Sequence, residues 1–144
     1  MPLDSLPCEF LFTITAHTAD KPAAIVPNGP AGTRVVVTAM RGEFGGPRLK
    51  GVIADAAGGD WVLARPGGSL KLDVRLVLQT DDGAAIYMTY SGVGRREPDG
   101  GVSVRTAPLF EVGDERYAWL NEVQAVGIGS STPTSVTYDI YALR

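Results

Sequence analysis

Asp60 is the carboxylate whose sequence neighbours best suit acid–base chemistry. It follows two glycines and stands directly before Trp61, where a strand is expected to begin. A carboxyl group held beside an indole at the rim of a barrel would have a raised pKa and could act as a general acid or base. The alternative is that Asp60 makes an Asx-type turn while Trp61 fills the core. Asp60 is the first catalytic candidate.

Asp73 is the second candidate, because it lies in the middle of an expected strand. The even positions of Leu70–Leu78 are all apolar, whereas Asp73 and Arg75 share the opposite face. A charged residue in such a place must either face water or be paired, for example by Arg75 or Arg105. Two interpretations stay open. Either this polar face lines a cavity, or Asp73 forms an ion pair on an exposed sheet surface.

Neighbouring strands carry further polar groups on one face. If the strands pair as hairpins, four side chains could converge: Asp73, Arg75, Tyr87 and Arg105. Two arginines with a carboxylate and a phenol would suit a polar or anionic ligand. Asp60 or Asp73 would then move a proton, while the arginines hold an anionic or enolate oxygen. Weaker signals in loops and strand ends add further binding candidates: Glu43, Arg48, Trp61, Tyr87, Trp119 and Asn121.

Composition argues against several classes of function. The net charge is -3 with 20% charged residues, so there is no basic excess to bind nucleic acid or an anionic membrane surface. The only cysteine and the only histidine, Cys8 and His17, are too few for a disulfide or for zinc and copper ligand sets. The sequence has no phosphate-cradling glycine loop, no dinucleotide fingerprint and no serine-hydrolase elbow. We therefore expect no metal and no cofactor.

The elements that must position these side chains are short strands. The 18 glycines and 10 prolines punctuate runs of β-branched and aromatic residues along the whole chain, which is typical of strands joined by turns. One helical turn is expected within Gly113–Asn121, near Tyr117–Asn121. The strands are expected at about Cys8–Thr15, Arg34–Met40, Leu49–Ala54, Trp61–Arg65, Leu70–Gln79, Ala84–Gly92, Val102–Phe110, Val123–Gly127 and Val136–Leu143.

A chain of 144 residues fits one domain, here residues 1–144. An antiparallel sheet of about nine strands tends to curl and close, because closure removes its edges. The sequence therefore predicts an all-β barrel or two-sheet sandwich. No apolar run reaches the roughly 18 residues of a membrane-spanning helix, and the first residues lack the features of a signal peptide. We expect a cytoplasmic protein.

A series of short motifs runs in order along almost the whole chain. They are Gly46–Gly51, Gly59–Trp61, Leu72–Arg75, Thr80–Gly83, Ile86–Tyr87, Arg105–Glu111, Tyr117–Asn121, Val126–Gly129 and Val136–Tyr141. The series resembles the bacterial and fungal proteins of domain-of-unknown-function family 3237. The resemblance implies an antiparallel, lipocalin-like β-barrel of about eight to ten strands, often assembled as a homo-oligomer, with no generally established activity. The stretch Val93–Gly101 looks like a compact version of a loop that varies in the family.

The leading hypothesis is a cofactor-free enzyme that performs proton transfer on a small organic molecule, such as an aromatic or polyketide-like compound. Isomerisation, cyclisation and lyase chemistry all fit it. Tyr87 and Asn121 would orient the ligand by hydrogen bonds, and Trp61 and Trp119 would stack on its apolar body. The alternatives are a non-catalytic carrier of a small apolar ligand and an oligomeric interaction module. A closed cavity that holds a carboxylate would favour catalysis, and a purely apolar one would favour carriage.

Overall fold

The computed structural model describes residues 1–144, except the side chains of residues 39 and 40. The described chain is almost entirely β-structure, with one 3-10 helix. Its elements are β1 (Cys8–Thr18), β2 (Ala24–Gly29), β3 (Gly32–Gly45), β4 (Lys50–Ala64), β5 (Leu70–Thr80), β6 (Ala85–Arg96), β7 (Val102–Thr106), β8 (Leu109–Val112), η1 (Glu115–Glu122), β9 (Ala125–Ser131) and β10 (Ser135–Leu143). No helix in this described part of the chain has the length and apolar character needed to span a bilayer.

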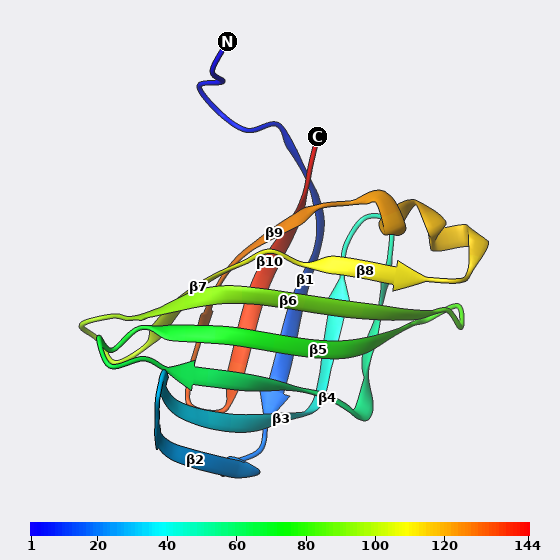
Figure 1. Cartoon of the computed structure of the whole chain (residues 1–144). Coiled ribbons are helices and arrows are strands. Elements are labelled where there is room, and N and C mark those ends of the chain that lie inside the picture. The colour runs from blue at the N-terminus through cyan, green and yellow to red at the C-terminus, as the bar shows by residue number, and fades with distance from the viewer.

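Eight of these strands close into an antiparallel barrel (Figure 1). The order around the barrel is β1, β10, β9, β7, β6, β5, β4 and β3, and β3 pairs back onto β1. Two shorter strands extend it, because β2 adds to β3 and β8 adds to β6 beyond β7. The predicted barrel and the predicted helical turn are both confirmed. Since the barrel is closed, strand alternation now decides which side chains face inward.

Three expected boundaries differ from the structure. The expected strand Val102–Phe110 is two strands, separated by Ala107 and Pro108, because proline cannot donate a ladder bond. The expected strands Leu49–Ala54 and Trp61–Arg65 are one long strand, β4. β2 lies between the expected strands Cys8–Thr15 and Arg34–Met40, where no strand was expected, because its residues are mostly exposed and include a proline.

A corner in β3 and β4 explains why β4 was predicted as two strands. The register of β3 against β4 shifts between Thr38 and Glu43, and that of β4 against β5 shifts between Ile53 and Gly58. Both strands turn at this corner (Figure 1). Such bulges bend a strand, and barrels use them to close. At the corner Ala56 has a φ of 56°, a left-handed conformation that costs an L-residue roughly 1–2 kcal/mol.

Replacing Ala56 with glycine should therefore stabilise the barrel. Glycine adopts positive φ without the steric cost, and we expect a gain of about 0.5–1 kcal/mol in the free energy of unfolding after its greater chain entropy is included. Ala57→Gly is the matched control in the same strand. It should lose about 0.5–1 kcal/mol. Urea titration of both variants measures the difference, and a loss of stability in Ala56→Gly would contradict the strain at this position.

One half of the barrel is filled by aromatic side chains. The ring of Phe12 makes edge-to-face contacts with Phe44, at 5.4 Å between ring centres, and with Phe110, at 6.1 Å. Leu120 of η1 is fully buried against this half. Edge-to-face rings pack densely and add to the burial energy. We call this filled half of the barrel, around Phe12, Phe44 and Phe110, the aromatic plug. It is covered by η1.

A polar clamp holds η1 against the turn between β5 and β6. Asp114 caps the helix by accepting from the Arg116 amide, and the Arg116 guanidinium contacts both Asp114, at 2.8 Å, and Asp82, at 3.3 Å. The Tyr117 hydroxyl donates to Asp82 at 2.6 Å. The hydrogen bonds from Arg116 hold the pKa of Asp114 at about 2. Asp82 is thus a structural turn residue, as its position before Gly83 suggests.

Candidate functional site

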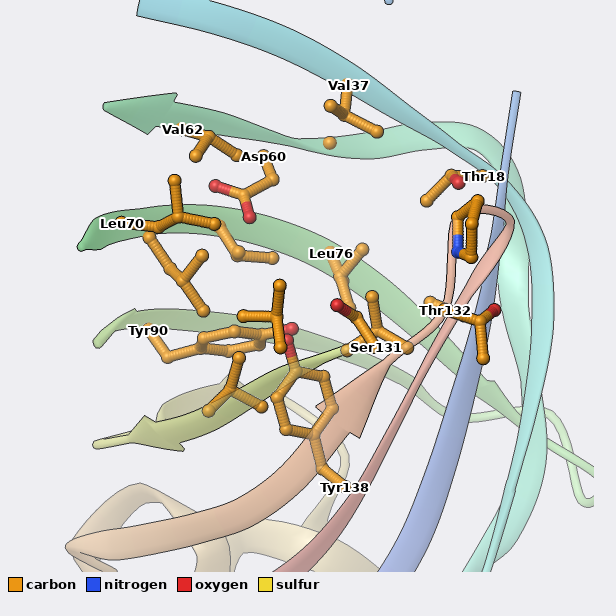
Figure 2. A pocket seen from close by; sticks show the side chains of 18 residues that line it. Thr18, Val37, Asp60, Val62, Leu70, Leu76, Tyr90, Ser131, Thr132 and Tyr138 are labelled. Atoms are coloured by element: carbon orange, nitrogen blue, oxygen red, sulfur yellow. The ribbon is translucent and has the colours of Figure 1, made fainter. Parts of the chain in front are cut away.

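The other half of the barrel is hollow. A cavity of about 190 Å³ lies between β1, β3, β4, β5, β6, β7, β9 and β10, next to the turn that joins β9 to β10. Figure 2 shows side chains from these strands pointing into one common space. One wall is aliphatic and comes from alternate residues of β5: Leu70, Leu72, Val74 and Leu76. Burying these side chains drives this half of the barrel to close, yet they are too small to fill it.

The alternation of β5 therefore contradicts the hypothesis that the polar face of this strand lines the cavity. Its apolar face is inside, and Asp73 and Arg75 are exposed on the outer surface. Arg105 is also exposed, and its Nη1 donates to the carbonyl of Val104. The predicted internal cluster of Asp73, Arg75, Tyr87 and Arg105 is wrong in placement. An apolar cavity wall gains more from the leucine face than from charged groups, which remain hydrated outside.

Asp60 is the carboxylate that does enter the cavity. It comes from β4, and its side chain points inward beside Val62 (Figure 2). Burial raises its pKa from 3.8 to about 6. The backbone hydrogen bond from Asp73 partly opposes this rise, and the negative charge of the Asp73 side chain adds to it. A carboxyl group with this pKa exchanges protons readily near neutral pH.

The position of Asp60 is set by a break in the β4–β5 ladder. Asp60 pairs with Val74, Trp61 and Val62 have no ladder partner in β5, and pairing resumes in the same register at Leu63 opposite Lys71. In the gap the amide of Asp73 donates to Asp60 Oδ1 at 2.9 Å. The carbonyl of Trp61 accepts from Arg34 Nη1 at 3.0 Å. Asp60 Oδ1 thus accepts a hydrogen bond from the Asp73 amide in place of the Trp61 carbonyl. This hydrogen bond fixes the orientation of the Asp60 carboxyl group.

Two phenols meet in the same cavity. Tyr90 of β6 and Tyr138 of β10 are both buried, and their rings lie edge to face with centres 5.5 Å apart. Burial raises the pKa of both hydroxyls. In Figure 2 the two hydroxyl groups point toward one another inside the cavity. The charge of Asp60 raises the pKa of both, which places the carboxylate and the phenols in one electrostatic environment.

Gly129 allows the Tyr138 ring to take this position. It lies opposite Tyr138 in the β9–β10 ladder. A Cβ atom at Gly129 would be 2.9 Å from Cδ1 of Tyr138 and 2.1 Å from the carbonyl oxygen of Thr137. Glycine in a strand often marks such a close approach. The ring therefore lies across a strand that has no side chain at this point.

The remaining predicted binding residues do not converge on the cavity. Trp61 is on the outer surface with 38% of its area exposed, and the Arg75 guanidinium lies 5.7 Å from its ring centre. Tyr87 of β6 is half-buried and pairs with Val77 and Glu111. These residues form outer contacts between neighbouring strands.

The others lie elsewhere on the barrel. The Arg48 guanidinium stacks on Trp119 at 3.6 Å from the ring centre. Asn121 bonds the amide and the carbonyl of Val112, which ties η1 to β8. Glu43 is exposed and lies 3.5 Å from His17 Nε2. These contacts are structural, and none of these four predicted residues lines the cavity.

Sequence reasoning missed Tyr90 and Tyr138, although a signal was present. Both stand on the apolar faces of their strands, Tyr90 with Ile86 and Met88, and Tyr138 with Val136 and Ile140. A tyrosine on such a face is buried, and its hydroxyl then needs a polar partner inside the protein. Two such tyrosines in different strands would have indicated a polar spot within an apolar interior.

Removing the outer charge of Asp73 should change the pKa of Asp60 without touching the cavity. In Asp73→Asn the main-chain hydrogen bond remains while the carboxylate charge is lost, so we expect the Asp60 pKa to fall below about 6. Carboxyl titration by NMR measures it. Asp81→Asn is the control, since it removes an exposed charge at the far end of β5. An unchanged Asp60 titration in Asp73→Asn would contradict coupling through the wall.

Comparison with known families agrees with this architecture. A family model described as a protein of unknown function, DUF3237, matches residues 6–143. The chain belongs to the DUF3237 family. Among similar members is the UPF0311 protein RPA1785 of Rhodopseudomonas palustris, 29% identical over 152 residues, which cover 95% of this chain and 96% of that protein. A beta-barrel like protein from Acinetobacter baumannii has a solved structure with a TM-score of 0.86 and 26% identity, covering 99% of this chain and 100% of that one.

One similar protein has a named activity. The hydroalkoxylation enzyme phnH of Penicillium herquei is 32% identical over 120 residues, which cover 83% of this chain and 71% of that enzyme. The solved structure of an enzyme from Penicillium herquei also resembles this barrel, with a TM-score of 0.71 and 26% identity, covering 97% of this chain and 98% of that one. At least one protein with a barrel similar to this one is thus described as an enzyme.

Proposed function

We propose that this member of the DUF3237 family is a cofactor-independent enzyme that transfers protons within a small organic molecule bound in the barrel. The observation that carries the proposal is Asp60. Its carboxyl group lies in an apolar cavity, is anchored at one oxygen by the Asp73 amide at 2.9 Å, and has its pKa raised to about 6. A buried carboxyl group tuned toward neutral pH is what general acid–base catalysis requires.

The two tyrosines supply the electrophilic half of the site. Each hydroxyl carries one hydrogen, so two neighbouring phenols that share one hydrogen bond still keep one hydroxyl hydrogen for a ligand oxygen. A donor fixed in a low-dielectric cavity stabilises negative charge that develops on a carbonyl oxygen. An aspartate base combined with a phenolic donor therefore suits reactions that pass through an enolate.

The similarity to a hydroalkoxylation enzyme supports a specific reaction, the addition of an O–H group across a C=C bond. Oδ2 of Asp60, the oxygen not tied to Asp73, would take the hydroxyl proton. The substrate oxygen then bonds the β-carbon of an enone as the π electrons move to the carbonyl oxygen, which the tyrosine pair stabilises. Asp60 returns the proton to the α-carbon. One O–H bond and one C=C π bond are exchanged for one C–O bond and one C–H bond, so the product is an isomer and no redox partner is needed.

A suitable probe is o-hydroxyphenyl propenyl ketone, which closes to a methylchromanone. We expect the protein to accelerate ring closure above the buffer rate and to yield an excess of one enantiomer, since the cavity fixes the approach of the two groups. Chiral chromatography measures the excess. Racemic product at the buffer rate, with the probe bound at saturation, would reject the proposed reaction.

Carriage of a small apolar ligand is the second candidate, favoured by the aliphatic wall of β5. A carrier needs the cavity but no acid–base group. Asp60→Asn separates the two functions. If the protein is a carrier, the variant binds and releases ligand as the wild type does, and neither protein transforms the bound ligand.

A further inference from the structure

The cavity is small, and among its described lining residues one, Asp60, has a charged side chain. Its volume of about 190 Å³ exceeds the roughly 150 Å³ of an apolar cavity that accepts benzene. One six-membered ring with short substituents therefore fits. A ring system of several fused rings would need the aromatic plug or the walls to move.

The charge of the lining is one-sided. Among the lining residues the structure describes, Asp60 is the one with a charged side chain, and none is lysine, arginine or histidine. An anionic ligand would bring a second negative charge into this apolar space with no cation to compensate it, which is costly. An ammonium ligand could pair with Asp60, but that attraction would have to offset the loss of hydration of the ammonium group, and a buried ion pair often does not.

The tyrosine pair fixes where a ligand oxygen would lie. The ring centres of Tyr90 and Tyr138 are 5.5 Å apart, and their hydroxyls can share at most one hydrogen bond with each other, so the pair keeps at least one hydroxyl hydrogen for the cavity. A buried donor without an acceptor costs free energy. A ligand oxygen that accepts from this pair would remove that cost, while the ring of the ligand packs against Leu72 and Val74.

We propose that the cavity selects uncharged one-ring compounds that carry an oxygen, bound with that oxygen at the Tyr90–Tyr138 pair, and that it rejects the corresponding anions through Asp60. The inference rests on the proposed function, because it treats this cavity as the substrate site. It goes further by naming the class of ligand and the residues that set each preference.

Four related probes test the charge and the oxygen separately. They are p-cresol, toluene, p-hydroxybenzyl alcohol and p-hydroxybenzoate, titrated into the full chain while amide shifts of the cavity strands are followed by NMR. At about pH 8, where Asp60 is ionised, p-cresol and p-hydroxybenzyl alcohol should bind at least about tenfold more tightly than p-hydroxybenzoate. The alcohol matches the benzoate in size, so this ratio reports charge. Toluene should bind about tenfold more weakly than p-cresol.

Two variants assign these preferences. In Asp60→Asn the discrimination against p-hydroxybenzoate should shrink toward unity, and in the double variant Tyr90→Phe/Tyr138→Phe the difference between p-cresol and toluene should do the same. Asp81→Asn, in the exposed β5–β6 turn, should keep both ratios within about twofold of wild type. Because all of these substitutions are nearly isosteric, thermal unfolding controls for loss of the fold.

Several outcomes would overturn the inference. Equal binding of p-hydroxybenzoate and p-cresol by the wild type would refute charge selection. A fifth probe, p-methylbenzylamine, tests for cations, and its tighter binding than that of p-cresol would reassign the cavity to them. Cavity amides that respond to none of the neutral probes would refute the ligand class. These are binding results, so they leave the ring-closure assay as an independent test. Conversely, binding as expected without any turnover would reject the proposed enzyme and keep the ligand class.

Discussion

Replacing Asp60 with asparagine should make the protein more stable at neutral and alkaline pH while removing its acid–base chemistry. The pKa of Asp60 is about 6 in the folded chain and 3.8 as the ordinary value, which corresponds to about 3 kcal/mol. Because the folded pKa is the higher one, ionisation opposes folding. The contribution of this group to stability falls as the pH rises from about 4 to 6 and stays low above that range.

Asparagine keeps an oxygen to accept from the Asp73 amide but carries no charge. We therefore expect Asp60→Asn to gain on the order of 2–3 kcal/mol in the free energy of unfolding at about pH 8, and to lose this advantage near pH 4. Ring closure of the enone probe should slow by about 10²–10⁴-fold, the usual contribution of a general base. Its wild-type rate should rise with pH through about 6, as the carboxylate forms.

Urea titrations at several pH values measure the stability difference. Asp81→Asn is the matched control, since it removes an exposed aspartate in the β5–β6 turn and should show no gain at high pH. If Asp60→Asn were no more stable than wild type at about pH 8, Asp60 would not be desolvated, and the central observation behind the proposed function would be lost.

Truncating Phe12 should be the most destabilising change in the aromatic plug. The side chain is fully buried and contacts two other rings. Phe12→Ala loses these contacts and leaves a void that the closed barrel cannot collapse, so we expect a loss of about 3–5 kcal/mol. Denaturant titration measures it, and the slope with denaturant should be unchanged if the fold is retained.

Phe10→Ala provides the comparison within β1. Phe10 is 37% exposed and contacts Tyr141 on the outer surface, with ring centres 5.8 Å apart. Its truncation should cost about 1 kcal/mol, the scale of one aromatic pair. Similar losses in the two variants would mean that the plug does not support the barrel.

The position and faces of β5 were predictable because its apolar and polar residues alternate strictly from Leu70 to Leu76. In β5 the apolar and polar faces were both identified from the sequence, and the barrel follows from the number of strands. Which face points inward was not predictable from alternation alone, because a polar interior and an apolar one give the same pattern. Because of this ambiguity, a place in the cavity wall was considered for Asp73, Arg75 and Arg105, whereas the structure has them on the outer surface.

Asp60 was singled out for a reason that the structure clarifies. Its glycine neighbours and the adjacent indole indicated a carboxylate in an unusual setting, and the structure places it in the cavity with a raised pKa. The hydrogen-bond partner that orients Asp60 is the main-chain amide of Asp73. Every residue type except proline has such an amide, so the sequence could not identify it. Likewise, the corner that joins the two halves of β4 depends on long-range register shifts that leave no local sequence signal.

The break in the β4–β5 ladder has a mechanical consequence. Ladder bonds between amides and carbonyls do not change with protonation, but the bond from the Asp73 amide ends on a titratable oxygen. A hydrogen bond to a carboxylate is about twice as strong as one to a neutral acceptor. The barrel wall is therefore stiffest at this seam when Asp60 is ionised, and it softens each time the carboxyl group holds a proton.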